Sequence, residues 1–316
     1  MSILSSGRPV FGYAEKAAKV EGAAEQAAAI NKEALENWTN PVWHAEKAAE
    51  IVRFIDETFE ADNTLAQFFR TTTVGEFDRV VKKKRTGIKA FWTHRGGYID
   101  ESGFGESEVE VPRDSVGFHV REFDDKVRSN YAAWLPELTQ SGYKAIETEI
   151  TRRVVTVLAE ASPVGSAQHI AGGATLTPQV LNAAIDAVAD APRTGGVGAD
   201  AQVSIVGRRS ALSALLDFTG YAQEAQEEIR KRGLLGLYRG AQIITLPNQL
   251  DETGQPFISD KEVFVLTRDV GEVVKYGAIR GNSWTENTAT YHHSQARAEV
   301  GVLVDQPHLL RRITLT

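Results

Sequence analysis

Charged side chains are concentrated between residues 80 and 118, and these are the residues in the chain whose types and spacing could do chemistry. Five bases come first, at Lys82, Lys83, Lys84, Arg85 and Lys89. Residues 93–118 then carry six acids against two arginines, a formal charge of two minus six, or -4, from Asp100, Glu101, Glu106, Glu108, Glu110, Asp114, Arg95 and Arg113. Carboxylates on a solvated segment lack the desolvation that tunes an acid or a base for catalysis. Two interpretations stay open: a surface for complementary contact, or ordinary solvated charge runs.

Metal chemistry is not favoured by the positions of the seven histidines. These are His44, His94, His119, His169, His292, His293 and His308. His292 and His293 would point to opposite faces of a strand, because successive side chains alternate. The His-Glu-x-x-His spacing of zinc enzymes is absent, and the chain has no cysteine, which excludes thiolate ligands and disulfides. We expect no metal site.

Cofactor binding and nucleophilic catalysis are not favoured either. The glycine-rich stretches TGGVGAD (194–200) and GLLGLYRG (233–240) lack the Lys-Ser/Thr end of a phosphate loop, and neither joins a strand to a helix as a dinucleotide fingerprint does. The Gly-x-Ser-x-Gly elbow of hydrolases is also absent. We therefore predict no cofactor and no enzymatic activity.

The composition is that of a folded, water-soluble protein. Of the 316 residues, 42% are hydrophobic, which is enough to form a core and argues against disorder of the whole chain. The net charge of -7 argues against nucleic-acid binding through a basic surface. A basic start followed by an apolar run is missing, and the longest apolar runs are too short to span a bilayer.

Helical patterns dominate the N-terminal half. Residues 14–37 are rich in alanine, glutamate and lysine and poor in large apolar groups, which predicts either a frayed helix or an arm that packs on another subunit. Residues 42–61 predict a second helix, with an apolar stripe of Val42, Ala45, Ala49, Val52 and Phe59 widened by Ile51 and Ile55. A third is expected at 136–161, starting with Pro136 in its first turn and burying Tyr143, Ile146, Ile150, Val154 and Leu158.

A long two-stranded hairpin is predicted between these helices. Residues 80–92 form its first strand, and alternation at Val109 and Val111 and again at Val116, Phe118 and Val120 predicts the return. Its root would be basic and its outer part acidic. The second half alternates short helices and strands. Thr177 and Pro178 open one helix, residues 201–207 form a buried strand, and residues 224–233 form a helix closed by Gly233. The fold class is α+β, in two unequal bodies with extensions.

The chain has two predicted extensions, the N-terminal arm and the hairpin, and no set of residues arranged for catalysis. This combination indicates a protein that contacts copies of itself. Ordering an arm costs conformational entropy, and only area buried on a partner offsets that cost. The order of elements resembles the major capsid proteins of tailed double-stranded DNA bacteriophages, which share the Hong Kong 97 fold. The stretches that carry the resemblance are the N-terminal arm, the hairpin from Lys82 to Val120, the helix from Pro136 to Ala161, LTPQVLNAAIDAVAD with ADAQVSIVGRRSAL, RGLLGLYRGAQIITLPN, and residues 276–316. It is greatest for siphophages of actinobacteria.

The resemblance implies a division of the chain into four parts. They are an N-terminal arm (1–54), a peripheral domain with a long spine helix (55–79, 121–165 and 300–316), an extended E-loop hairpin (80–120) and an axial domain (166–299). Inter-subunit contacts are then expected at Lys82, Lys83, Lys84, Arg85, Lys89, Glu106, Glu108, Glu110, Arg113 and Arg239. Some members crosslink a hairpin lysine to an asparagine of a neighbouring subunit. Lys82–Lys84 and Lys89 lie near the hairpin and Asn282 and Asn287 lie late in the chain. The resemblance does not match them to the reacting positions residue by residue, and noncovalent contact is expected.

By the same resemblance, the chain assembles into hexamers and pentamers of an icosahedral shell around phage double-stranded DNA. The implied partners are copies of itself, a separate scaffolding protein, a portal and a decoration protein, with nonspecific DNA contact and no membrane. Its place is the virion, after assembly in the bacterial cytoplasm. Two rivals stay open: an encapsulin-like nanocompartment shell, which would need a cargo pocket on its inner surface, and a soluble hydrolase, which would need a deep pocket with convergent polar groups.

Overall fold

The computed structural model describes residues 25–61, 64–85, 106–191, 202–218, 236–246, 259–286 and 290–316. The chain divides into two compact units. The first contains Met1–Glu60, Gly117–Ala145 and Ile279–Arg297, and the second contains Ala61–Val116, Ile146–Ala278 and Ala298–Thr316. Helix α4 (Tyr131–Ala161) and strands β4 (Asp114–Phe123) and β12 (Tyr291–Val304) each have residues in both units. None of the described helices is both long and apolar enough to cross a membrane.

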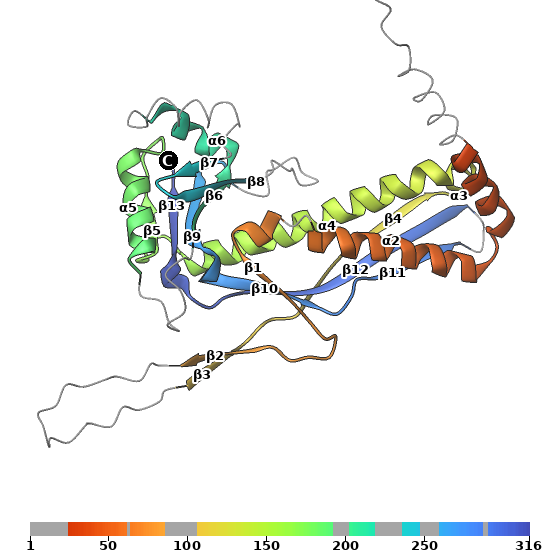
Figure 1. The fold of residues 1–316 in the computed structure, drawn as a ribbon, viewed down its shortest axis with the longest axis horizontal. Coiled ribbons are helices and arrows are strands. Elements are labelled where there is room, and N and C mark those ends of the chain that lie inside the picture. The colour runs from red at the N-terminus through yellow and green to blue at the C-terminus, as the bar shows by residue number, and fades with distance from the viewer. Residues whose placement is uncertain are drawn as a thin grey trace, which may run out of the picture. The chain divides into compact units, whose positions relative to one another are not determined.

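Within the first unit, helices cover one face of an antiparallel sheet (Figure 1). Strand β12 pairs with β11 (Arg280–Thr285) and with β4. The helices are residues 25–37, α2 (Pro41–Ala61), α3 (Asp124–Ser129) and the first half of α4. Their core is an aromatic cluster around Trp38, Trp43 and Tyr131. The buried indole of Trp38 donates a hydrogen bond of 2.8 Å to the carboxylate of Asp124, so its one polar group is satisfied.

Helix α2 confirms the predicted helix and, of the predicted apolar positions, Ile51 and Ile55, whereas Val42, Ala45 and Ala49 are exposed. Val42 is 62% exposed, whereas Trp43, Ala48, Ile51 and Ile55 are buried. The stripe is rotated because Trp43 and Trp38 pack against each other with ring centroids 5.9 Å apart, and the large aromatic group decides which face turns inward.

Helix α4 begins five residues before its predicted start. Pro136 lies inside the helix, so placing it in the first turn was wrong. The carbonyl of Asn130 accepts hydrogen bonds from the amides of Ala133 and Trp134, and the helix therefore begins at this turn, where Tyr131 joins the aromatic cluster. The predicted stripe is confirmed: Tyr143, Ile146, Ile150, Val154 and Leu158 are all buried.

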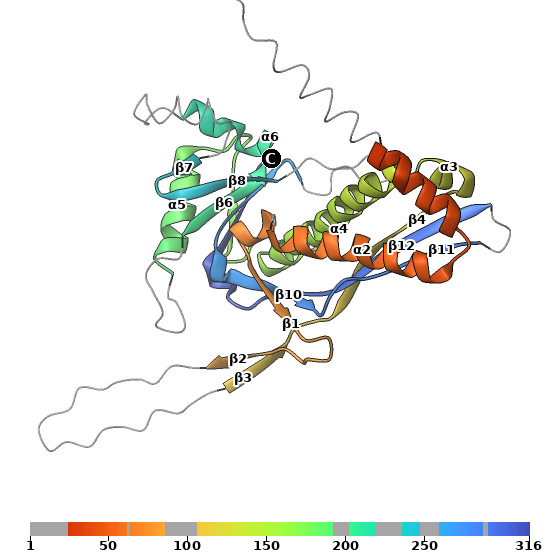
Figure 2. The same cartoon turned by 45° about the vertical axis from the view of Figure 1, so that its right-hand side comes forward.

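The second unit contains three groups of strands (Figure 2). In the first, β10 (Gly271–Tyr276) pairs with β1 (Arg70–Val74) and with the second half of β12. The second is a six-stranded sheet in the order β5-β13-β9-β6-β8-β7. Its strands are β5 (His169–Ala171), β13 (Leu310–Thr314), β9 (Glu262–Thr267), β6 (Val203–Arg208), β8 (Ala241–Leu246) and β7 (Gly236–Tyr238). The third is the ladder of β2 (Val81–Arg85) and β3 (Glu106–Glu110).

The six-stranded sheet buries its apolar residues against helix α5 (Pro178–Ala189) and the turns α6 (Arg209–Leu212) and η2 (Ser213–Asp217). The predicted cap is confirmed, because the side chain of Thr177 accepts a hydrogen bond from the amide of Val180 and Pro178 starts the helix. The predicted buried strand is β6, with Ile205 and Val206 fully buried. The predicted helix at 224–233 lies outside the described residues.

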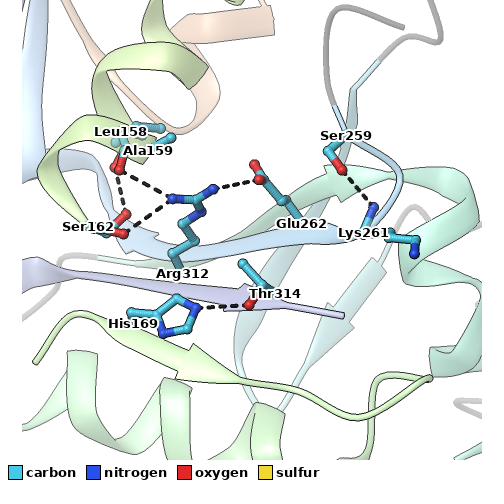
Figure 3. A network of polar contacts seen from close by, with 9 residues as sticks. All are labelled: Leu158, Ala159, Ser162, His169, Ser259, Lys261, Glu262, Arg312 and Thr314. Carbon is cyan, nitrogen blue, oxygen red and sulfur yellow. Dashed lines mark hydrogen bonds and ion pairs between the residues drawn. The ribbon is translucent and has the colours of Figure 1, made fainter. Parts of the chain in front are cut away.

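The C-terminal strand is fastened to the end of α4 by one arginine (Figure 3). Arg312 of β13 forms an ion pair of 2.6 Å with Glu262 of β9. Its guanidinium also donates to the carbonyls of Ala159 and Ser162 at 3.4 Å, where the helix ends with carbonyls that have no partner within the helix. Both charged side chains are largely buried, at 15% and 18% exposure. Arg312 therefore links strand β13 to both strand β9 and the end of helix α4.

Candidate inter-subunit site at the hairpin root

The charged hairpin strands lie side by side rather than one beyond the other. The register of β2 and β3 sets Lys83 opposite Glu108 and Arg85 opposite Glu106, with Lys82 opposite Val109. A basic root with an acidic outer part was therefore the wrong interpretation for these glutamates. Opposite charges directly across a ladder favour this register. Asp100, Glu101 and Lys89 lie outside the described residues.

Lys82 attaches the hairpin root to the strands beneath it. Its ammonium lies 2.7 Å from a carboxylate oxygen of Glu272 on β10. The Glu272 side chain is only 6% exposed, and its other oxygen, Oε1, has no hydrogen-bond partner. A buried carboxylate is costly without a partner, so the ion pair with Lys82 compensates the buried charge. Nearby, burial raises the pKa of Asp305, with Lys82 acting in the opposite direction.

A second ion pair closes the end of the ladder. Arg79 donates two hydrogen bonds to Glu110, at 2.9 and 2.7 Å. The hydrogen bond from Arg79 lowers the pKa of Glu110, and its positive charge acts in the same direction. Both groups are exposed, so water and salt screen this pair and it serves alignment more than stability.

The return strand leaves the hairpin after Val111, whose amide donates a hydrogen bond of 3.1 Å to the carbonyl of Val80. The predicted pairing through Val120 was wrong, because β4 pairs with β12 and not with β2. Gly301 of β12 permits this path, since a Cβ there would overlap the carbonyl oxygen of Pro112. Arg113 pairs with Glu299 and lies 4.9 Å from the ring centroid of Tyr276. The described part of the hairpin is therefore a two-stranded ladder of β2 and β3, separate from the sheet that contains β4 and β12.

Arg239 is the predicted contact residue that the fold does not bring to this site. It sits at the turn between β7 and β8 with a left-handed φ of 48°, followed by Gly240 at 82°. Its guanidinium pairs with Asp186 of α5 at 3.3 Å. Arg239 therefore belongs to the six-stranded sheet and is separate from the hairpin.

Residues that sequence reasoning missed complete the root. Arg79, Glu272 and Glu299 each pair with a charge on or next to the hairpin. Glu272 carried the one usable signal, because an acid within an otherwise buried strand needs a partner. Nothing in the sequence named Lys82 as that partner, because the two residues are far apart along the chain.

In the described ranges, no group of three or more histidine, aspartate or glutamate side chains is placed to hold a metal ion. The prediction that His292 and His293 point apart is confirmed. His292 packs against Trp38 and Trp134, whereas His293 stacks on Trp284. The site at the hairpin root is a surface of paired charges.

Comparison with known proteins gives no matching family model and no match among curated sequences. Solved structures do match. The mature capsid of bacteriophage PhiM1 superposes with a TM-score of 0.56 at 12% identity, covering 78% of this chain and 86% of that one. A Mycobacterium phage Adephagia structure gives 0.55 at 11% identity, covering 80% and 90%. The head of Helicobacter pylori bacteriophage KHP40 gives 0.55 at 12% identity, covering 78% and 86%.

These likenesses extend over most of both chains, and the mixed helices and sheets agree with the α+β class expected from the sequence. At this identity, the shared property is the arrangement of elements. The chain has the Hong Kong 97-like fold of tailed-phage capsid shells.

Proposed function

We propose that this chain is a structural major capsid protein that self-assembles into hexamers and pentamers of an icosahedral shell around a phage double-stranded DNA genome. The observation that carries the proposal is the fold, shared with a mature phage capsid and a phage head over at least 78% of this chain. Likeness to structures from Mycobacterium phages is compatible with an actinobacterial siphophage. The nanocompartment shell and the hydrolase are not favoured by these neighbours.

The hairpin supports self-assembly independently. Beyond β2 and β3, no described strand joins this ladder, and a two-stranded ladder is marginally stable in water. Val109 and the two residues beside it are exposed. A neighbouring subunit is the partner that would bury this surface, with Lys82–Arg85, Glu106, Glu108, Glu110 and Arg113 contributing to register. Arg239 and Lys89 would contact other neighbours in the same shell.

The remaining parts follow from this role. We infer an N-terminal arm (1–54), a peripheral domain (55–79, 121–165 and 300–316), the E-loop (80–120) and an axial domain (166–299). A scaffolding protein, a portal and a decoration protein are the partners of such a shell, which contacts packaged DNA nonspecifically. Assembly would take place in the host cytoplasm and the product would be the virion. The chain would act without catalysis, cofactor or membrane.

Electron microscopy and sedimentation of the purified chain test the proposal. We expect closed shells when the chain is expressed with its neighbouring genes, and capsomer rings or shells when it is expressed alone. A small oligomer under both conditions would contradict a capsid role. A particle that copurifies with an enzyme would instead identify a nanocompartment.

Reversing the acidic strand tests the role of the hairpin. We expect the variant Glu106→Lys/Glu108→Lys/Glu110→Lys to fold but to form few shells, because like charges then face each other across the ladder and toward a neighbour. Circular dichroism would confirm folding, and the yield of particles in a sucrose gradient would be measured.

A charge-swapped hairpin distinguishes repulsion within the ladder from repulsion toward a neighbouring subunit. The variant Lys83→Glu/Arg85→Glu/Glu106→Lys/Glu108→Lys keeps an opposite charge at each of these register positions but inverts the signs shown to a neighbour. If a neighbouring subunit forms ion pairs with these charges, the swapped variant also fails to assemble. Wild-type particle yield from it would show that only the pairing within one hairpin matters.

A further inference from the structure

One turn of the second unit carries an aromatic side chain that the fold leaves uncovered. Residues 75–78, Gly-Glu-Phe-Asp, follow strand β1 and lead toward β2 (Figure 2). Phe77 is 89% exposed, which is more than any other large apolar side chain in the described ranges. Single exposed apolar residues are common on protein surfaces, so the exposure alone indicates little. The way in which the turn holds Phe77 adds the missing information.

Hydrogen bonds close this turn and attach it to the sheet. The amide of Asp78 donates to the carbonyl of Gly75 at 3.1 Å, and the carboxylate of Asp78 accepts from the amide of Gly75 at 2.7 Å. Beside them, the amide of Gly277 donates to the carbonyl of Val74 at 2.8 Å. A Cβ at Gly277 would lie 3.1 Å from the Cβ of Glu76, so the turn also rests against the residue that follows β10. The backbone beneath the aromatic ring is already ordered, and a partner would not have to order it.

A pocket of the same unit has the size and chemistry to receive such a ring. It measures about 120 Å³ and lies where β4, α4 and β12 meet. A cavity of about 150 Å³ holds a benzene molecule, so this pocket is close to the size of one phenyl ring. Its apolar lining, here called the valine pocket, consists of Val116, Ile150, Val300 and Val302. Arg153 stands at the rim, where a guanidinium would be attracted to the face of an aromatic ring.

The turn and the valine pocket are different surfaces of one copy. The turn continues from β1, the pocket is lined by β12, and β10 lies between these two strands. Because Phe77 is exposed, its ring does not fill the pocket of its own chain. A contact between two different surfaces of identical chains is head-to-tail, and contacts of this type generate closed rings when the rotation between copies closes. Hexamers and pentamers are rings of this kind.

Charge complementarity favours the same contact. Glu76 and Asp78 flank the aromatic ring, so the turn brings two negative charges with it. Arg153 at the rim and Arg152 beside it on α4 have side chains 48% and 46% exposed, and each is paired with one acid of its own copy. A guanidinium has five N–H donors and can bind a second carboxylate.

We propose that Phe77 of one copy inserts into the valine pocket of a second copy. The inference rests on the proposed function and names one contact that joins neighbouring subunits. Two other pockets, of about 240 and 410 Å³, lie in the first unit and are lined mostly by polar side chains. Glu122 and Glu137 line the first of them and would repel the acids of the turn. One phenyl ring would leave the second partly empty and lose packing contacts.

Photo-crosslinking from position 77 tests the contact directly. In the full chain, Phe77 is replaced by p-benzoylphenylalanine, which keeps an aromatic ring at this position, and the assembled particles are irradiated. Half of the chains are labelled with heavy nitrogen, so a crosslink between copies can join a light peptide to a heavy one. The matched control carries the same photo-reactive residue in place of Val164, which is 75% exposed in the same unit. Mass spectrometry of the digested particles identifies both peptides.

We expect crosslinks between light and heavy peptides from position 77 to residues 114–116, 149–153 or 300–302, and none of these from position 164. Crosslinks from position 77 to residues 50–53 or 120–141, to a different protein, or within one copy alone would overturn the inference. Shells would still form in these cases, so the proposed function would stand. An unmodified chain that forms no shells would overturn both.

Truncation of the ring supplies a second readout. We expect Phe77→Ala to raise the protein concentration needed for assembly by roughly tenfold, the change that 1.4 kcal/mol produces when an aromatic anchor is lost. Phe77→Leu should give a smaller rise, and the control Val164→Ala none. Thermal unfolding of the unassembled chain should not change, because the side chain is exposed. Assembly of Phe77→Ala at the wild-type concentration would contradict the inference.

Discussion

Replacing Arg312 by methionine is expected to lower the free energy of unfolding by about 3–5 kcal/mol, the cost of breaking a buried ion pair from one side. The change leaves Glu262 charged and largely buried without its partner. It also removes the donor to the carbonyls of Ala159 and Ser162 at the end of α4. Denaturant unfolding followed by circular dichroism would measure the loss.

The double variant Arg312→Met/Glu262→Met is the matched control. Two apolar side chains of similar length leave no buried charge, so we expect the double variant to recover most of the lost stability. Arg311 offers a comparison on the same strand, since within the described ranges its guanidinium donates to the carbonyls of His308 and Leu310 and to no carboxylate. An equal loss from Arg311→Met would contradict the special role of Arg312.

Acidification from pH 7 to pH 5 is expected to destabilise the first unit through His292. Burial, followed by the nearby His44 and His293, lowers the pKa of His292 to about 3. The imidazole is therefore neutral in the fold, where it is hydrogen-bonded to Ser283 at 2.9 Å, and it gains a proton on unfolding below its usual pKa of about 6.5. Its contribution to stability is complete above pH 6.5 and is lost as the pH falls toward 3. At pH 5 the loss is about 2 kcal/mol.

Tryptophan fluorescence would measure this effect where it occurs. Trp38, Trp43, Trp134 and Trp284 all belong to the first unit. The control His292→Gln keeps hydrogen-bonding capacity but does not titrate. We expect the stability of this variant to fall less steeply between pH 7 and pH 5 than that of the wild type. Identical slopes would show that other groups carry the pH dependence.

Sequence periodicity predicted elements well where local rules decide. The stripe on α4 was readable because a 3.6-residue repeat needs no knowledge of the partner. The cap at Thr177 was readable because one side chain and the proline after it set the helix start. Pro136 misled because the start of α4 is fixed at Asn130 by packing of Tyr131. Tertiary contact overrode the local signal there.

The site was harder to predict than the elements. The charges at 82–85 and 106–110 were evident, but their register was not, because a charge pattern does not specify which residue stands opposite which. The Lys82–Glu272 ion pair joins segments that only the folded chain brings together. The alternation within one strand indicates which side chains share a face, but it does not indicate which residue of another strand lies opposite each of them.

The position of the last strand bears on when the protein can fold during its synthesis. Strand β13 lies between β5 and β9 in the six-stranded sheet, and the ladders on its two sides cannot form before residues 310–314 have left the ribosome. Long-range pairing of this kind delays the completion of a fold. A nascent chain would therefore hold this sheet unfinished until β13 has emerged from the ribosome.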